Sequence, residues 1–174
     1  MKKEYVEIGG VKWAKMNVGA EKETDFGLYF QYGAEQGYPY PTNLCKFNKT
    51  PTEFCNSVQA YWGGNWRMPT KEEFESLRNS TTTEWVENYQ GSGVNGRLFT
   101  DRNDSSKTLF FPACGYCVNG RVYGVGDAGY YWSSSIDFYE SNYAFGLLFS
   151  NASTNLCINY SHCGFVLRGV LTDK

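Results

Sequence analysis

The feature that most constrains the fold of this chain is a series of short apolar runs, each bounded by glycines or polar turns. In the second half of the sequence these runs are GRLFT, TLFFPACGY, GRVYGV, GYYWSSS, NYAFGLLF, LCINY and GFVLRGV. Runs of this length, rich in aromatic and β-branched residues, are typical of strands. With 12 Phe, 14 Tyr and 5 Trp, aromatic rings supply much of the apolar volume. This pattern predicts a glycine-rich α+β fold of short, mainly antiparallel strands with one or two helices.

A hairpin is predicted at the start of the chain, and an irregular segment follows it. EYVEIGG and VKWAKMNVG read as two strands, and Gly9 and Gly10 between them fit a tight turn. GLYFQYG predicts a short aromatic strand bounded by glycines. Residues 34–65 contain three of the five prolines, so no regular element is expected there.

The segment RMPTKEEFESLRNS carries the clearest helix signal. Thr70 is followed three residues later by Glu73, which is the spacing of a capping box. Acidic residues in the first turn suit the positive end of the helix dipole, and Phe74 and Leu77 share one face. These signals predict a helix over residues 70–79.

Length and charge limit the function classes. A chain of 174 residues fits one domain, and it is long enough to bury a core without metal or disulfide bonds. Its net charge of −2 provides no basic field for a phosphate backbone, so no nucleic-acid partner is expected. No apolar run reaches membrane-spanning length, so direct membrane insertion is not expected. The two lysines of MKKEYVEIGGVKW precede no apolar segment, so no signal peptide is expected either.

The cysteines allow several interpretations. Six are present, which allow 15 full pairings: Cys45, Cys55, Cys114, Cys117, Cys157 and Cys163. Free thiols are the default expectation without a signal peptide, and Cys45–Cys55 is the best candidate for a bridge if the protein is exported. Cys114-Gly-Tyr-Cys117 matches a redox spacing, but it follows a strand and runs into a turn. Two ordinary small residues are therefore the favoured interpretation.

Other candidate chemistry is weaker still. His162 is the single histidine, and no Ser-His-Asp arrangement can be assembled around it. Asp101 and Asp104 lack the full ligand series of a calcium loop, which favours a solvated turn. The cysteine spacings suit a zinc site poorly. Neither a metal nor another cofactor is expected.

Residues 136–163 have a biased composition. The chain contains 34 Lys, Glu, Gln, Met and Trp residues, and only Glu140 lies in this window. All residue types that remain can arise when the two adenines of an Asn codon are replaced at random. The bias indicates a binding surface diversified by mutation, and a chance composition of two polar loops is the alternative. Tyr, Ser and Asn suit binding in either case, because Tyr buries much area with few rotatable bonds and the others hydrogen-bond adaptably.

Six motifs in this order resemble the Fibrobacter succinogenes major paralogous domain, which is abundant in gut Bacteroidetes and their phages: VKWAKMNVGA, DFGLYFQYG, WGGNWRMPTKEEFESL, LFFPACGY, GYYWSSS and GFVLRGV. The likeness covers residues 5–170. It implies a C-type-lectin-like fold of the formylglycine-generating-enzyme subtype. The chain departs from the family at Cys114 and Cys117, where Ala and a polar or basic residue are usual, and at Val166, where a polar residue is usual. None of these changes threatens the fold.

The frame WSSS…A…L.F…GF..R also resembles the variable region of proteins targeted by diversity-generating retroelements. In those proteins, adenine-specific mutagenesis rewrites Asn codons on a lectin-fold surface. The resemblance implies that Ala144, Leu147 and Phe149 belong to the fixed frame, and it leaves three candidate variable positions on the same segment: Phe145, Gly146 and Leu148.

Strand alternation and the frame motifs also predict which side chains are buried. In LCINY, alternation places Leu156 and Ile158 inward and the side chains between and after them outward. Trp62, Trp66 and Trp132 are candidates for stacking on a sugar. Trp66 and Trp132 belong to the frame motifs, however, so core packing is favoured for these two. Arg168 is expected to be buried and paired with a carboxylate.

These observations predict one ligand-binding domain over residues 1–174 and not an enzyme. Its recognition surface is expected to comprise sixteen residues: Ile136, Asp137, Phe138, Tyr139, Ser141, Asn142, Gly146, Leu148, Asn151, Asn155, Cys157, Asn159, Tyr160, Ser161, His162 and Cys163. The expected partner is a protein or glycan on a cell surface, and the expected location is extracellular, on a cell surface or on a phage virion. The oligomeric state is left open. One alternative is an undiversified carbohydrate-binding or adhesin-type domain of a gut bacterial surface protein. A less favoured one is a formylglycine-generating-type oxidase, in which Cys157 and Cys163 would bind copper.

Overall fold

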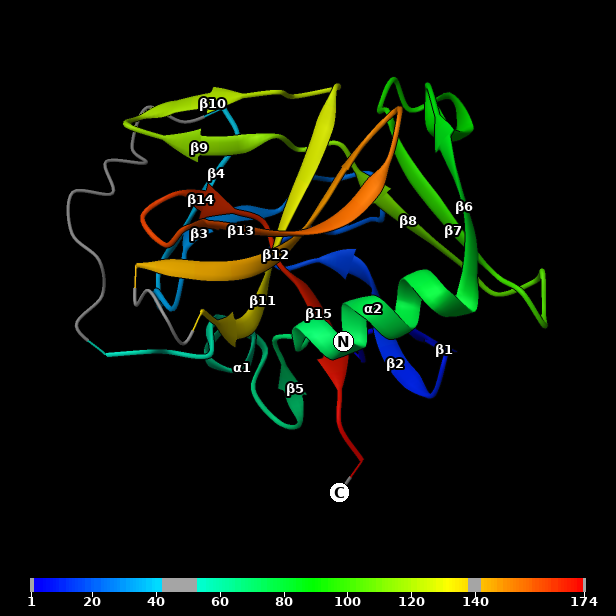
Figure 1. The fold of residues 1–174 in the computed structure, drawn as a ribbon, viewed down its shortest axis with the longest axis horizontal. Helices are drawn as coiled ribbons and strands as arrows, with labels where there is room; N and C mark the ends of the chain where they lie inside the picture. Colours follow the sequence, from blue (N-terminus) through cyan, green and yellow to red (C-terminus); the bar gives the residue numbers. More distant parts are fainter. Residues whose placement is uncertain (1, 42–52, 138–141, 174) are drawn as a thin grey trace.

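The computed structural model describes residues 2–41, 53–137 and 142–173. Within these residues, two α-helices and one short 3-10 helix lie among fifteen strands, which pair antiparallel in four sheets (Figure 1). The predicted α+β class with mainly short antiparallel strands is confirmed. In the described part of the chain, no helix is both long enough and apolar enough to cross a membrane.

The two ends of the described chain meet in one four-stranded sheet. In order across it, the strands are β1, β2, β15 and β5, which span Tyr5–Ile8, Val11–Asn17, Arg168–Leu171 and Trp66–Arg67. The predicted hairpin is confirmed as β1–β2. Gly9 and Gly10 form its turn with φ angles of 60° and 77°, a conformation that favours glycine. Because β15 pairs with β2, the last strand is held by the first hairpin.

Two further sheets have five and three strands. The five-stranded sheet has the order β10, β9, β14, β3 and β4, which span Arg121–Tyr123, Tyr116–Val118, Gly164–Phe165, Leu28–Gln31 and Gly37–Pro39. The three-stranded sheet has the order β6, β7 and β8, which span Thr81–Val86, Gly96–Asp101 and Thr108–Pro112. Strand β3 is the one predicted in GLYFQYG. Strand β6 was not predicted, and it begins directly after the second helix.

The helices are α1 (Ser57–Trp62), α2 (Lys71–Ser80) and the 3-10 helix η1 (Tyr89–Gly91). Helix α2 is the predicted one. Both hydrogen bonds of the capping box between Thr70 and Glu73 are present, and the apolar residues predicted on its inner face are buried. The expectation that residues 34–65 hold no regular element is wrong at both ends of the segment. Strand β4 forms there, and α1 begins where the Asn56 side chain accepts a hydrogen bond from the backbone N–H of Gln59.

The central sheet consists of β11, β12 and β13, which span Ala128–Ile136, Tyr143–Ser150 and Thr154–Tyr160. Hydrophobic clusters lie on both of its faces. Leu147 and Phe149 belong to the cluster around Trp13 and Phe74. On the other face, Ala144 belongs to a second cluster of buried residues, which also includes Trp132, Phe165, Val58 and Met68. The predicted frame residues of β12 are therefore buried.

Trp132 anchors the second cluster. Its ring stacks on Phe165 at a centroid distance of 3.9 Å, and its indole Nε1 donates to the carbonyl oxygen of Phe30 at 3.0 Å. Core packing is thus confirmed for this tryptophan. Trp66 is only half-buried, and it contacts Trp62 edge-to-face at 5.2 Å beside the same cluster.

Arg168 is fully buried, as predicted, but the predicted carboxylate partner is wrong within the described residues. Its guanidinium donates to Asn17 Oδ1 at 2.8 Å, to the carbonyl oxygen of Ala14 at 3.2 Å and to that of Phe110 at 2.9 Å. It also lies 4.3 Å from the ring centroid of Phe111. Burial lowers the pKa of Arg168 to about 10, so the side chain stays charged at neutral pH. Neutral oxygens, fixed by the two strands β2 and β8, replace the expected ion pair.

Candidate functional site

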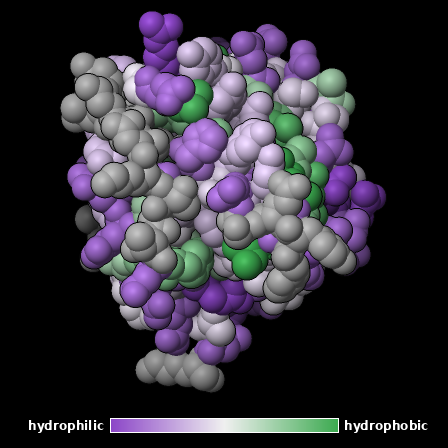
Figure 2. All heavy atoms as spheres, turned by 60° about the vertical axis from the view of Figure 1, so that its left-hand side comes forward, coloured by the Kyte–Doolittle hydropathy of each residue, from purple (hydrophilic) through white to green (hydrophobic). Residues whose placement is uncertain are grey.

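Three segments of residues 136–163 meet at one end of the central sheet, where β11 ends, β12 begins and β13 ends. Tyr143 pairs with Tyr160 across β12 and β13. The backbone N–H of Asp137 donates to the carbonyl oxygen of Tyr143 at 3.1 Å, and that of Ser161 donates to Asn142 at 2.8 Å. We call this region the open end of the sheet, and its further members are Ile136, Phe145, Ile158 and His162. Figure 2 brings this side of the molecule forward and shows pale and green residues among hydrophilic ones.

Large side chains are exposed at the open end. Tyr160 is 52% exposed, Ile158 is 46% exposed and Ile136 is 44% exposed. The ring of Tyr160 lies between two others, with centroids 4.6 Å from Tyr143 and 5.3 Å from His162. Such a row presents apolar ring area together with two phenol groups and an imidazole, a combination that supports binding.

Alternate residues along β12 share one face of the strand, and this face runs from the buried core to the row of rings at the open end. One face of the strand carries two partly buried residues, Tyr143 and Phe145, followed by two fully buried ones, Leu147 and Phe149. Phe145 is only partly buried, and the Nζ of Lys71 at the start of α2 lies 4.4 Å from its ring centroid. The open end therefore has a cation at its border, placed there by the helix.

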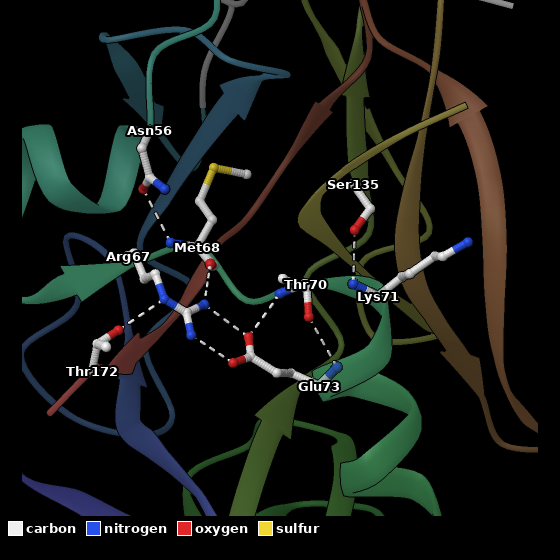
Figure 3. A network of polar contacts seen from close by, with 8 residues as sticks. All are labelled: Asn56, Arg67, Met68, Thr70, Lys71, Glu73, Ser135 and Thr172. Carbon is white, nitrogen blue, oxygen red and sulfur yellow. Dashed lines mark hydrogen bonds and ion pairs between the residues drawn. The ribbon is translucent and has the colours of Figure 1, made fainter. Parts of the chain in front are cut away.

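A polar network ties the segment before α2 to the end of β11 (Figure 3). Arg67 holds Glu73 through two hydrogen bonds, at 2.6 Å to Oε1 and 2.9 Å to Oε2, and the Glu73 carboxylate also accepts from the backbone N–H of Thr70 at 2.8 Å. The backbone N–H of Lys71 donates to Ser135 Oγ at 3.0 Å. These contacts fix the helix start and the strand end relative to each other, which positions one border of the open end.

This network gives a pH-dependent prediction for Glu73→Gln. Burial alone would raise the pKa of Glu73, but hydrogen bonds from Arg67 and Thr70 hold it below its usual value. A lowered folded-state pKa contributes stability that is present above the unfolded pKa, about 4.3, and is lost as the pH falls through the folded value. At pH 7, we expect Glu73→Gln to lower the free energy of unfolding by about 1–2 kcal/mol.

Urea melts of Glu73→Gln and the wild type at pH 7 and pH 3 measure this effect. The difference between the two proteins should shrink at the lower pH. Glu75→Gln, on an exposed position of the same helix, is the matched control and should change the free energy of unfolding by less than about 0.5 kcal/mol. Equal destabilisation by both substitutions would show that the Arg67 contact contributes nothing specific.

The structure describes thirteen of the sixteen predicted surface residues, because Phe138, Tyr139 and Ser141 lie outside the described residues. Six are exposed: Ile136, Asn142, Asn151, Asn155, Tyr160 and His162. Five are partly buried: Asp137, Leu148, Cys157, Asn159 and Cys163. Two are buried: Gly146 and Ser161.

The two buried positions correct the predicted surface. A Cβ on Gly146 would lie 2.7 Å from the carbonyl oxygen of Tyr131, so no side chain fits there. Ser161 is 3% exposed, and its carbonyl oxygen accepts a hydrogen bond from the backbone N–H of Tyr32. Both residues hold strands together and cannot vary freely as contact residues.

The exposed positions are also not one contiguous group. Asn151 and Asn155 lie at the hairpin between β12 and β13, at the far end from Tyr160. With a rise of about 3.3 Å per residue, the two ends of β13 are about 20 Å apart. The open end therefore gathers only part of the predicted surface: Ile136, Asp137, Asn142, Asn159, Tyr160 and His162.

The assignment of faces in LCINY is partly wrong. Leu156 packs inward, as predicted, but Ile158 is exposed although alternation from Leu156 places both on one face. The core beneath this face ends before Ile158, which pairs with Phe145 at the open end. Sequence reasoning therefore missed Ile158, Tyr143 and Lys71, and the unusual density of large side chains near Tyr160 was the available signal.

Burial disfavours the thiolate form of three described cysteines. Burial raises the pKa of Cys114 to about 12, and it also raises the pKa values of Cys157 and Cys163. Each is a free cysteine, as is Cys55, while Cys45 lies outside the described residues. The structure thus supports the interpretation of Cys114-Gly-Tyr-Cys117 as ordinary packing residues.

Metal-ligating side chains are dispersed in the part of the chain that the structure describes, where no three His, Cys, Asp or Glu residues cluster closely enough to hold an ion. In TDRND, Asp101 Oδ1 accepts from the backbone N–H groups of Asn103 and Asp104, which is the hydrogen bonding of a turn.

Comparison with protein-family models finds no match, and neither does comparison with curated proteins or with solved structures.

Proposed function

We propose that this chain is a ligand-binding domain that recognises a protein or glycan on a cell surface through the open end of its central sheet. The observation that supports this most directly is the row of the partly buried Tyr143 and the exposed Tyr160 and His162, with the exposed Ile158 beside it, above a densely packed aromatic core. Recognition surfaces concentrate aromatic anchors within a polar surround in this way. The proposal includes the C-type-lectin-like fold implied by the resemblance of the six sequence motifs.

We further propose that the open end is diversified by a retroelement. The near absence of Lys, Glu, Gln, Met and Trp from residues 136–163 supports this, as does the burial of the frame residues Ala144, Leu147 and Phe149. A surface can vary without loss of the fold only where its variable side chains lie outside the core. A near-copy of this segment beside a reverse-transcriptase gene, rich in A-A-pyrimidine codons, would identify the diversification directly.

A tetramer of the full chain provides the binding test. Labelled wild-type tetramer is applied to a glycan microarray and to intact gut-bacterial cells, and each positive target is then tested with Tyr160→Ser. Because Tyr160 presents a large ring that is 52% exposed, its loss should weaken binding at least about tenfold, the scale of a residue worth more than 1 kcal/mol at an interface.

Tyr5→Ser is the matched control, since Tyr5 is an exposed tyrosine on β1, which lies on the other side of the molecule from the open end in Figure 1. It should bind like the wild type. Equal binding by Tyr160→Ser and the wild type, or no bound target among cells and glycans, would contradict the proposal. A second outcome would favour the undiversified adhesin-type alternative. In that outcome, the bound target is a glycan and different isolates share the same sequence over residues 136–163.

A further inference from the structure

A second surface hollow lies at the opposite end of β13 from the open end. It is a cleft of about 400 Å³ between the last turn of α2, the start of β6, and Thr154 at the start of β13. Arg78 lies on α2, and Arg102 follows β7 at the neighbouring turn. Every side chain that borders the cleft is a cation, an amide or a hydroxyl, and no carboxylate borders it. The cleft is therefore positively charged although the chain as a whole is acidic.

The two arginines are available to a ligand. In the described part of the chain neither guanidinium forms an ion pair. Arg102 uses its Nε to donate to the carbonyl oxygen of Asn79 at 3.2 Å, which orients the side chain and leaves its two terminal nitrogens. The nearby carboxylate of Asp101 accepts from backbone N–H groups in its own turn. The guanidinium groups of Arg78 and of the oriented Arg102 both border the cleft, and two such groups match the oxygens of a tetrahedral anion.

The hydroxyl groups at the cleft support the same ligand chemistry. Thr83 Oγ1 accepts a hydrogen bond from Arg97 Nε at 3.3 Å, so its own proton can be donated elsewhere. Thr154 Oγ1 is buried and has no hydrogen-bond partner within the described residues. Rotation about χ1 exchanges the methyl and hydroxyl positions of a threonine, so it can turn the Thr154 hydroxyl toward the cleft. An anion bound there would supply the acceptor that this hydroxyl lacks.

We propose that this cleft binds a sulfate or phosphate ester group, with Arg78 and Arg102 as the charged contacts and Thr83 and Thr154 as hydroxyl donors. The site is independent of recognition at the open end, because the two lie at opposite ends of β13. A ligand that carries such esters would gain a charged contact at the cleft, and this contact does not depend on the aromatic contacts at the open end.

Nuclear magnetic resonance titration of the full chain tests the site. The probes are inorganic sulfate, inorganic phosphate, glucose 6-sulfate and glucose 6-phosphate, each added at an ionic strength held constant with sodium chloride. Saturable shifts of the Arg78 and Arg102 Nε–H signals are expected, and the tighter-binding members of the series identify the ester and show whether the sugar contributes. Arg102→Gln should weaken binding at least about tenfold, and Thr154→Val, which replaces the hydroxyl by a methyl group, about threefold or more.

Arg121→Gln is the matched control, because it removes one positive charge from an exposed position on β10. It should retain wild-type affinity, which separates a specific site from a general effect of charge. The proposal is wrong if none of the four probes gives saturable shifts, or if Arg102→Gln and Arg121→Gln bind equally well while both remain folded.

Discussion

Replacing Arg168 by Met should lower the free energy of unfolding by about 3–5 kcal/mol, the range for removing one partner from a buried charged contact. The methionine keeps much of the aliphatic volume but leaves the oxygens of Asn17, Ala14 and Phe110 without their donor. The loss extends further, because the amide of Asn17 also donates to the hydroxyl of Tyr131 at 3.2 Å. Guanidinium chloride melts at pH 7 measure the effect.

Arg168→Lys separates the contribution of charge from that of hydrogen-bond geometry, since it preserves the positive charge and removes the planar guanidinium group. One ammonium group cannot reach three acceptors on two strands at once, so Lys should recover only a minor part of the loss. Arg121→Met, on the surface, should change the free energy of unfolding by less than about 0.5 kcal/mol. Full rescue by Lys would mean that charge alone, and not the geometry of the hydrogen bonds, stabilises this part of the core.

Trp132→Ala should lower the free energy of unfolding by about 3–5 kcal/mol, as expected for truncating a large buried aromatic residue. The substitution removes the ring that stacks on Phe165 and the donor to the carbonyl oxygen of Phe30. Trp132→Phe keeps a ring but loses the indole donor, so a smaller loss of about 1–3 kcal/mol is expected. Thermal and denaturant melts of both variants measure the two contributions, and an equal loss for Ala and Phe would assign the whole effect to the hydrogen bond.

Local sequence signals predicted the elements whose stability is local. Thr70 and Glu73 predicted the start of α2 because a capping box is complete within four residues. Gly9 and Gly10 predicted the first hairpin for the same reason. By contrast, β6 has few turn signals and directly follows a helix, and its strand conformation depends on pairing with β7, the next strand. Helix α1 was hidden because prolines earlier in residues 34–65 dominated the composition of that segment.

Strand alternation predicted the frame of the candidate site better than its contact residues. Ala144, Leu147 and Phe149 are buried because the central sheet has a hydrophobic cluster on each face. Alternation could not show where each cluster ends, and that boundary exposes Ile158. It also could not show that Ser161 hydrogen-bonds with the backbones of two other segments. Both facts depend on contacts with residues elsewhere in the chain, which the sequence of a single strand does not contain.

The central claim is that the open end binds a ligand and contributes little to the stability of the fold. The most direct measurement takes the triple variant with Ile158, Tyr160 and His162 each replaced by Ser, and compares its cell or glycan binding with that of the wild type in samples whose urea melts are recorded in parallel. At about 0.5 kcal/mol or less for each surface position, the free energy of unfolding should fall by no more than about 1.5 kcal/mol, while binding is lost. Retained binding, or destabilisation as large as that of Trp132→Ala, would contradict the claim.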